Sequence, residues 1–375
     1  MDAHYHPTYL VGRSDTNAQA GILNCGGQQV HWASAPRIYY QGKQNDRGAV
    51  MQMPHIPPEE VYPWLDSMFK AAQNKLAAQW RWSKGATTMT TAYYDPTNFT
   101  LAVSHAGDSP AYLMLSDGDK SAWIQLTSPF HVFRDNLLSW VSGVKSEQKD
   151  CFRCEHASVF SHMDAEITQN KSAALSELQQ RIDAIFTLFE QPYSIVNKTV
   201  EELESEHWEV IDEANQYLWK TEENPDYRTP LDLQKTIEKS ADYYDMNIEQ
   251  VEASIVIATD GINEQKNHEL AALAFDASAA PNLASRFCKL SEKKNDNIAL
   301  AVIPDIKQGK GKPCFICMND GIGKNSAQTA EAAMDAALDI ALQKQEYIDP
   351  VRSARRGCWT RLLGEKRNDP SPHFP

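Results

Sequence analysis

Residues 101–113 read LAVSHAGDSPAYL, which is two apolar runs separated by a turn of Gly, Asp, Ser and Pro. Runs of this length and composition are typical of strands, and the four turn residues favour a chain reversal. Similar apolar runs lie on either side, at 87–94 and 122–126, with polar turns between them. The region therefore predicts four successive antiparallel strands.

Helices and two further strands are predicted outside this region. The runs 253–258 and 298–303 are short and continuously apolar, which is typical of buried strands. Apolar residues recur every three to four positions in 57–80 and in 326–347, the period of a helix packed on one face. Strands and helices in this mixture indicate an α+β protein.

Composition excludes several classes of protein. The 375 residues are enough for about two domains, and 42% hydrophobic with 23% charged residues is the balance of a folded chain. No apolar run reaches the roughly 18 residues that a membrane helix needs, and the first residues lack the features of a secretory signal. A net charge of −14 argues against a nucleic-acid partner.

Cysteine usage predicts the compartment. Seven cysteines in a chain of this length do not form a disulfide scaffold, and the odd number favours a reducing environment. We therefore expect a cytoplasmic protein, either in the cell that makes it or after delivery into a host cytosol.

Two acids stand at the ends of the buried strands. Asp260 follows the first of them and precedes Gly261, and Asp296 lies just before the second. Carboxylates at such positions can bind hard divalent cations, which prefer oxygen ligands. An isolated Asp-Gly pair is more often a turn or a helix cap, so both interpretations stay open on these residues alone.

Four runs in succession resemble the signature motifs of the metal-dependent protein phosphatases (the PPM family, phosphatase type 2C). They are GATT at 85–88, LAVSHAGDSPAYL at 101–113, IVIATDGI at 255–262 and NDNIALAV at 295–302. The resemblance implies an α-β-β-α sandwich of two antiparallel sheets flanked by helices. It covers 1–130 and 250–305, which leaves 131–249 as a helical acidic insertion. Residues 306–375 then form a C-terminal extension with a C-x-x-C pair, a helix and a basic tail.

The resemblance also implies a chemistry. In this family a pair of Mg²⁺ or Mn²⁺ ions is held by carboxylates from an E-D pair, a D-G-x-G-G loop, the S-D-G aspartate and the D-N aspartate. The ions make a water molecule acidic enough to attack phosphorus. Asp260 and Asp296 match the last two elements, and Asp108 is expected to support its own loop structurally.

The first half of the chain departs from the family pattern. In the register that we chose, Ala18 and Gln19 occupy the E-D pair, Gln41 with Gly42 occupies the D-G loop, and Pro129 replaces a further acid. Two divalent ions need several anionic oxygens, so this register predicts at most one weakly bound Mg²⁺ or Mn²⁺. Asp15 and Asp46 lie near the missing positions, and a shift of register would bring them in.

Two functions follow from these alternatives. The first is a pseudophosphatase that binds a protein partner through the acidic helical insertion, where residues 197–250 contain 15 acidic and 5 basic residues. The second is an active Mg²⁺- or Mn²⁺-dependent serine/threonine phosphatase, or a related phosphoprotein hydrolase, with a nonstandard metal site. A solvated helical face is the simpler explanation of the acidic segment.

The chain carries two C-x-x-C pairs: Cys151 with Cys154, and Cys314 with Cys317. Four thiolates in two such pairs can form a tetrahedral structural Zn²⁺ site. His156 and His162 are alternative ligands beside the first pair. Four unrelated, partly buried thiols remain the competing interpretation.

Overall fold

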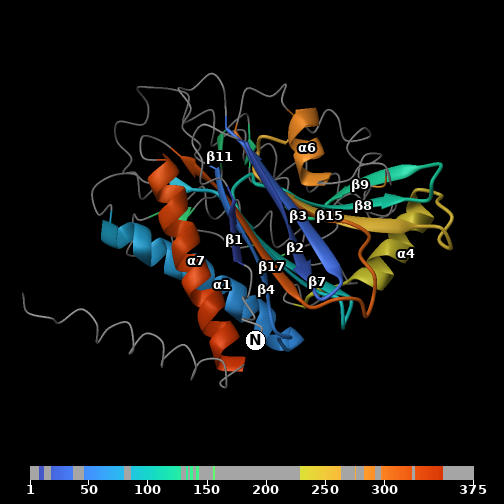
Figure 1. The fold of residues 1–375 in the computed structure, drawn as a ribbon, viewed down its shortest axis with the longest axis horizontal. Coiled ribbons are helices and arrows are strands. Elements are labelled where there is room, and N and C mark those ends of the chain that lie inside the picture. The colour runs from blue at the N-terminus through green and yellow to red at the C-terminus, as the bar shows by residue number, and fades with distance from the viewer. Residues whose placement is uncertain are drawn as a thin grey trace, which may run out of the picture.

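The structure is a computed structural model. It describes residues 8–11, 18–36, 46–79, 86–127, 132–133, 136–137, 141–142, 155–156, 229–262, 275, 283–291, 297–322 and 326–348. In this part of the chain two antiparallel sheets pack face to face, and helices lie on their outer faces (Figure 1). The predicted α+β sandwich of two sheets flanked by helices is confirmed.

The first sheet has the strand order β1-β4-β17-β6-β7-β13, with three short strands paired beside this path. Its strands are β1 (Thr8–Val11), β4 (Asp46–Gln52), β17 (Cys314–Ile322), β6 (Met89–Asp95), β7 (Thr100–Ala106), β13 (Glu155–His156), β5 (Ala86–Thr87), β12 (Val141–Ser142) and β14 (Leu231–Asp232). A separate two-stranded pair is formed by β10 (Val132–Phe133) and β11 (Asn136–Leu137).

The second sheet has the order β2-β3-β16-β15-β8-β9. Its strands are β2 (Gln19–Cys25), β3 (Gln28–Ala35), β16 (Ile298–Ile303), β15 (Glu252–Ala258), β8 (Ala111–Ser116) and β9 (Ser121–Gln125). The four strands predicted around 101–113 are present, but they do not form one meander. The hairpin β6–β7 belongs to the first sheet and the hairpin β8–β9 to the second, so the turn 107–110 carries the chain from one sheet to the other.

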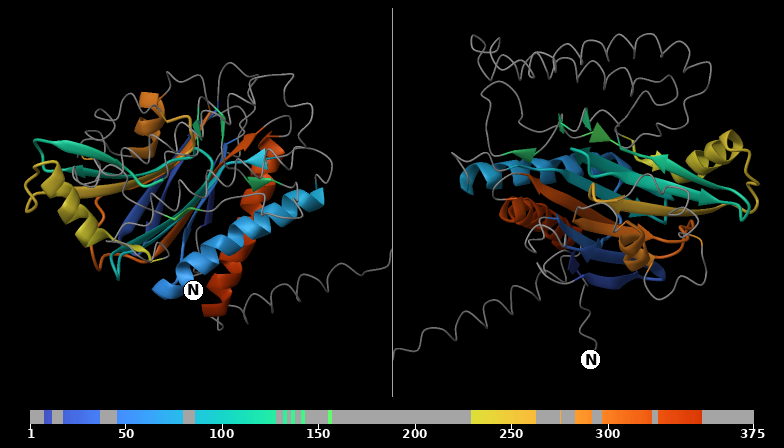
Figure 2. Two further views of the ribbon diagram at one scale, coloured as in Figure 1. Left: turned by 180° about the vertical axis from the view of Figure 1, so that it is seen from behind. Right: turned by 90° about the horizontal axis from the view of Figure 1, so that it is seen from above.

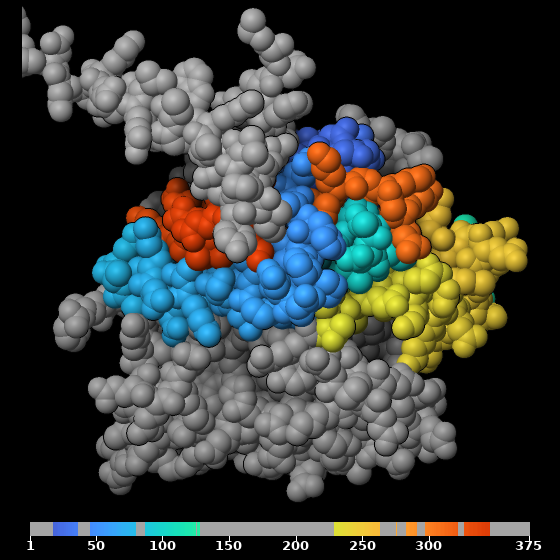
Figure 3. Space-filling model, turned by 90° about the horizontal axis from the view of Figure 1, so that it is seen from below, coloured from blue at the N-terminus to red at the C-terminus, as the bar shows by residue number. Residues whose placement is uncertain are grey.

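Helices cover both outer faces. α1 (Pro58–Gln79) and α7 (Ser326–Ile348) pack side by side on the first sheet, and α6 (Leu283–Ser291) packs on the second (Figure 2). The space-filling view shows α1 along the outer surface with α7 beside it (Figure 3). The helices predicted at 57–80 and 326–347 are confirmed. None of the helices in the described ranges is long and apolar enough to cross a membrane.

The apolar core lies between the two sheets, with a second cluster under the helices of the first sheet. Side chains from both sheets are fully buried in the space between them, among them Leu23, Val50, Leu113, Ile255 and Ile316. Under α1, Trp64 makes edge contacts with the rings of Tyr93 and Phe315, at centroid distances of 5.7 and 5.4 Å. Edge contacts of this kind add to the free energy gained by burial.

Two predicted domain boundaries do not divide the fold. Residues 306–375 were expected to form an extension, but β17 from this segment lies between β4 and β6 in the middle of the first sheet. α4 (Leu233–Tyr243), from the end of the predicted insertion, contributes Leu233 and Ala241 to the core between the sheets. The core is therefore complete only when the C-terminal third of the chain is in place.

A histidine holds the start of α6. The Leu283 backbone N–H donates to Nδ1 of His31 at 3.0 Å, and Nε2 of the same ring lies 3.1 Å from Oε1 of Gln29. This arrangement requires a neutral ring that carries its proton on Nε2. Burial lowers the pKa of His31 below its usual 6.5, which favours that neutral form.

We predict that His31 makes the stability of the fold depend on pH. Because its pKa is lower in the folded chain, the unfolded chain binds the proton first, so stability is full above about pH 6.5 and declines as the pH falls below it. His31→Gln should lack this component and should cost about 1 kcal/mol at pH 7.5 through the weakened helix start. Urea unfolding of both proteins between pH 5.5 and 7.5 measures the difference. An identical pH dependence in the two proteins would contradict the prediction.

Candidate carboxylate site between the sheets

Two aspartates face each other in the middle of the first sheet. Asp46 opens β4, Asp320 lies near the end of β17, and the strand register places the two directly opposite. The Asp46 side chain is only 1% exposed, and the two carboxyl groups share a hydrogen bond. Two carboxyl groups so close together can share a hydrogen bond only while one of them is protonated.

Two more acids act on this pair. Asp260 follows β15 in the second sheet, and Asp108 lies in the turn between β7 and β8. Burial raises the pKa of Asp320 well above its usual range, and the negative charges of Asp46, Asp260 and Asp108 raise it further. Four segments that are far apart in the sequence thus place three further carboxyl groups within electrostatic reach of Asp320.

A threonine hydroxyl connects the two sheets at this cluster. Thr259 Oγ1 donates to Oδ2 of Asp46 at 2.7 Å, and it accepts the backbone N–H of Ala299 at 2.9 Å. The Thr259 backbone N–H donates in turn to the carbonyl of Ala299, also at 2.9 Å. Thr259 therefore holds the Asp46 side chain and the start of strand β16. Because it directly precedes Asp260, it also fixes the start of the turn that carries this acid.

A second threonine holds the backbone of Asp320. The Asp320 N–H donates to Thr88 Oγ1 at 3.0 Å, and the Thr88 N–H donates to the Asp320 carbonyl at 2.8 Å. The Thr88 hydroxyl also lies 2.6 Å from the hydroxyl of Ser109, which follows Asp108. The GATT and GDS runs of the sequence therefore position β17 and its aspartate.

Both Asp-Gly pairs need glycine because another backbone segment lies against it. A Cβ at Gly261 would be 1.9 Å from the carbonyl oxygen of Asn297, and a Cβ at Gly321 would be 1.8 Å from that of Ser326. These contacts pack the turn after β15 against the start of β16, and the end of β17 against the start of α7.

The donor set fits a hard divalent cation. All four groups offer carboxylate oxygen, which Mg²⁺ and Mn²⁺ prefer, and the Thr259 hydroxyl contacts one of them. In the part of the chain that the structure describes, no three His, Cys, Asp or Glu side chains are already arranged around one point as metal ligands. Asp46 and Asp320 instead bond to each other, which is the arrangement expected of carboxylates that have kept a proton.

The structure places only some of the predicted site residues. Asp260 lies in the cluster, whereas Asp296 is outside the described residues. Gln19 opens the edge strand β2, opposite Ser34 of β3, and Ala18 is exposed beside it. Gln41, Gly42, Pro129 and Asp15 also lie outside the described residues. Asp46, which the shifted register would bring in, belongs to the cluster.

Asp320 was missed although its sequence carries the signal. Residues 320–323 read DGIG, which contains the D-G-x-G of the family pattern, and they directly precede α7. In the family order this loop comes before the G-D-S run, and that order predicts it in the first 45 residues. Here it comes after the D-N run, at the end of a strand that had been assigned to a separate extension.

The described residues do not bring the thiols of the second C-x-x-C pair together. Residues three apart in a strand point to opposite faces, and the two lie in different clusters: Cys314 between the sheets, Cys317 under α1 and α7. Burial raises the pKa of the Cys317 thiol to about 12, which disfavours the thiolate that binds zinc. Cys151 and Cys154 lie outside the described residues, so their part in a zinc site stays a prediction.

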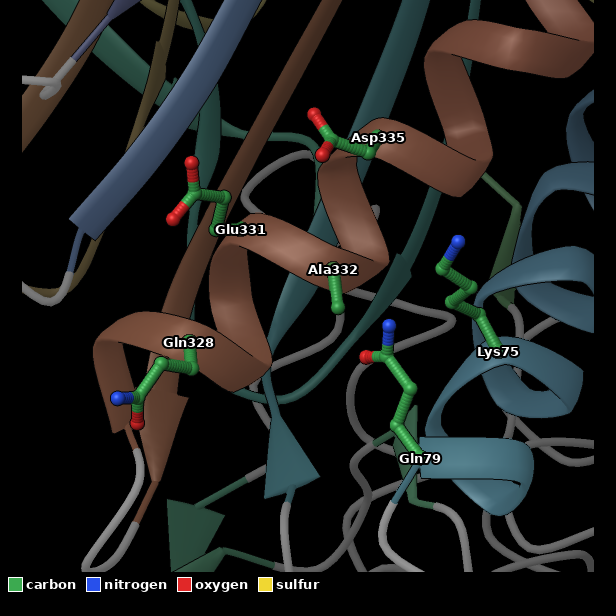
Figure 4. Close-up of a pocket in the computed structure, with 6 residues that line it drawn as sticks. All are labelled: Lys75, Gln79, Gln328, Glu331, Ala332 and Asp335. Atoms are coloured by element: carbon green, nitrogen blue, oxygen red, sulfur yellow. The ribbon is translucent and has the colours of Figure 1, made fainter. Parts of the chain in front are cut away.

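A pocket of about 350 Å³ lies between α1 and α7. Figure 4 shows that its lining comes from α1 and α7. The lining residues are Lys75, Gln79, Gln328, Glu331, Ala332 and Asp335. Sequence analysis did not single out these residues, whose charges are mixed.

Comparisons with known proteins give little similarity. No family model matches the chain, and no curated protein matches it. Among solved structures, a serine-threonine phosphatase 2C from Toxoplasma gondii is 13% identical, with 79% of this chain and 98% of that chain covered. The TM-score of 0.28 is too low to establish a shared fold.

We predict that the Thr259 hydroxyl is needed to hold Asp46. Thr259→Val keeps the shape but leaves Asp46 and the Ala299 N–H without this partner, at a cost of about 2 kcal/mol in the free energy of unfolding. Thr259→Ser keeps the hydroxyl and should lose less than about 1 kcal/mol. Denaturant unfolding of the two variants is the measurement. Equal losses in Val and Ser variants would show that packing, not the hydroxyl, matters at this position.

We also predict that Gly321 tolerates no side chain. Gly321→Ala brings a Cβ against the carbonyl of Ser326, and a backbone atom in a packed helix start cannot move away cheaply, so a loss of about 3 kcal/mol or more is expected. Gly118→Ala is the control, since a Cβ there meets nothing within 4 Å and only its positive φ of 94° opposes the change. Thermal unfolding compares the two. A Gly321 variant as stable as the Gly118 variant would contradict the prediction.

Proposed function

We propose that the protein is a divalent-cation-dependent phosphohydrolase that acts on phosphoserine or phosphothreonine in proteins, or on a related phosphate ester. The observation that carries this proposal is that Asp46, Asp108 and Asp260 all lie within electrostatic reach of Asp320. The choice of a phosphate ester rests on the four sequence runs that resemble the PPM phosphatases.

The cluster is suited to a cation because several negative charges act on one carboxyl group. Asp46 is buried and the half-buried Asp320 lies beside it, which raises the free energy of the ionised pair, and Asp260 and Asp108 add to it. A cation that displaces the shared proton would relieve this repulsion. Bound there, Mg²⁺ or Mn²⁺ would make a water molecule acidic enough to serve as the nucleophile toward phosphorus.

The protein's own contribution is to fix the carboxylates before the substrate arrives. Thr259 orients Asp46, and Thr88 fixes the backbone of Asp320 through two hydrogen bonds. The close backbone contacts at Gly261 and Gly321 hold the turn after β15 and the end of β17. Preorganised ligands of this kind avoid the cost of rearrangement during the reaction.

A pseudophosphatase is the second candidate. What favours it is that, in the described part of the chain, the carboxylates are hydrogen-bonded to one another rather than grouped around a common point. In this case the acidic segment 197–250 would bind a protein partner of basic character. Most of that segment lies outside the described residues, so this role stays a prediction.

Manganese titration together with phosphatase assays separates the two candidates. We expect the purified protein to gain thermal stability on addition of Mn²⁺, because a ligand that binds only the folded state stabilises it. It should also hydrolyse p-nitrophenyl phosphate and a phosphothreonine peptide only when Mn²⁺ or Mg²⁺ is present. Asp320→Asn should abolish the Mn²⁺-induced shift and lower kcat at least about 100-fold.

The matched control is Asp339→Asn, which removes an exposed acid on the outer side of α7. It should keep both the shift and the activity. Asp320→Asn should be at least as stable as the natural protein in the absence of metal, because it removes a buried carboxyl group among like charges. Turnover without any added or retained divalent cation, or full activity in Asp320→Asn, would contradict the proposal. Absence of both binding and turnover would favour the pseudophosphatase.

A further inference from the structure

Two cysteines far apart in the sequence meet between the sheets, at the end of the core remote from the carboxylates. Cys25 is the last residue of β2 in the second sheet, and Cys314 is the first residue of β17 in the first sheet. Both side chains are fully buried and belong to the same apolar cluster. Neither residue was paired with the other in the analysis of the sequence.

Backbone contacts hold the two segments against each other. The Lys312 N–H donates to the carbonyl of Cys25 at 2.7 Å, two residues before Cys314. Gly311 packs so closely on the β2–β3 turn that a Cβ there would be 2.8 Å from the same carbonyl. The segment that precedes β17 is therefore fixed on the residue that carries the partner thiol.

The side chains also interact directly. The Cys25 thiol lies close enough to Cys314 to raise the pKa of the Cys314 thiol, and burial raises it further. Cys317, three residues further along the same strand, faces the helices, and its thiol lies near Asn319 Oδ1 at 3.8 Å. Cys314, but not Cys317, thus has a second thiol beside it.

We propose that Cys25 and Cys314 form a disulfide that links the two sheets when the protein meets a hydroperoxide. In the first step one thiol sulfur attacks the O–O bond, which gives a sulfenic acid and releases the alcohol, or water from hydrogen peroxide. In the second step the other thiol attacks the sulfenic sulfur, the S–S bond forms, and water leaves with the remaining proton. Each disulfide consumes one hydroperoxide.

The burial of the pair determines how the reaction behaves. Since the thiolate is the reactive form, a raised pKa and the lack of solvent access make oxidation slow. The product closes a loop of about 290 residues, and cross-links that close long loops restrict the unfolded chain most. The linked protein should therefore resist unfolding more than the reduced one.

Peptide mapping after oxidation tests the proposal. The native protein is incubated with hydrogen peroxide, its remaining thiols are alkylated in denaturant, and a tryptic digest is analysed by mass spectrometry without reductant. We expect a cross-linked species that joins peptide 14–37, which holds Cys25, to peptide 311–324, which holds Cys314 and Cys317. The oxidised protein should unfold at a temperature higher by about 5 °C or more, and reductant should reverse the shift.

Two matched variants identify the sulfur that reacts. Cys317→Ala removes the neighbouring thiol in the same peptide and should keep the cross-link and the thermal shift. Cys314→Ala should lose the cross-link and the thermal shift. If this variant folds poorly, peptide mapping of the natural protein still tests the proposal. Recovery of Cys25 and Cys314 as alkylated free thiols, after the cysteines in other peptides have been oxidised, would overturn the proposal. A cross-link through Cys317 would overturn it equally.

Discussion

The pairing of Asp46 with Asp320 across β4 and β17 is the interaction on which the candidate site depends. Two carboxyl groups directly opposite each other in buried strands are unfavourable unless they share a proton or bind a cation. Apolar residues of similar volume would give a more stable sheet at these positions. A fold that keeps acids here, and adds Asp260 from the other sheet, has the features of a binding site rather than of a structural core.

The sandwich architecture explains how these acids meet. β4 and β17 lie in the first sheet and β15 in the second, so the space between the sheets receives side chains from both. The Thr259 hydroxyl connects the two sheets at this level, and the Thr88 hydroxyl fixes the end of β17 within the first sheet. The turn at 107–110, which carries the chain from one sheet to the other, brings Asp108 to the same end of the sandwich.

The strands and helices with strong periodicity could be predicted from the sequence. α1, α7, β15 and β16 lie where their apolar patterns indicated, because each buries one face or both. The assignment of β6–β7 and β8–β9 to different sheets could not be predicted. A short turn can either join neighbouring strands of one sheet or carry the chain from one sheet to the other. Asp260 was found because its motif stands in the expected order, and Asp46 entered only through an alternative register.

Asp320 illustrates the limit of reasoning by motif order. Its D-G-x-G run can be recognised in the sequence. The pairing of β17 with β4 could not be predicted, because the two strands are more than 260 residues apart in the chain. The contact of Cys25 with Cys314 could not be predicted for the same reason, because these two residues are also far apart in the sequence. Local patterns predict elements, whereas the pairing of strands from opposite ends of the chain is a property of the whole core.

The central claim is that these carboxylates form a cation site, and the location of a bound metal tests it most directly. Crystals soaked in Mn²⁺ and measured at a wavelength with strong manganese anomalous scattering would show the position of the ion independently of any assay. The account predicts an anomalous peak between Asp46, Asp260 and Asp320, with the hydrogen bond between Asp46 and Asp320 broken. An empty cluster at high Mn²⁺ concentration, with those two carboxyl groups still bonded to each other, would contradict it.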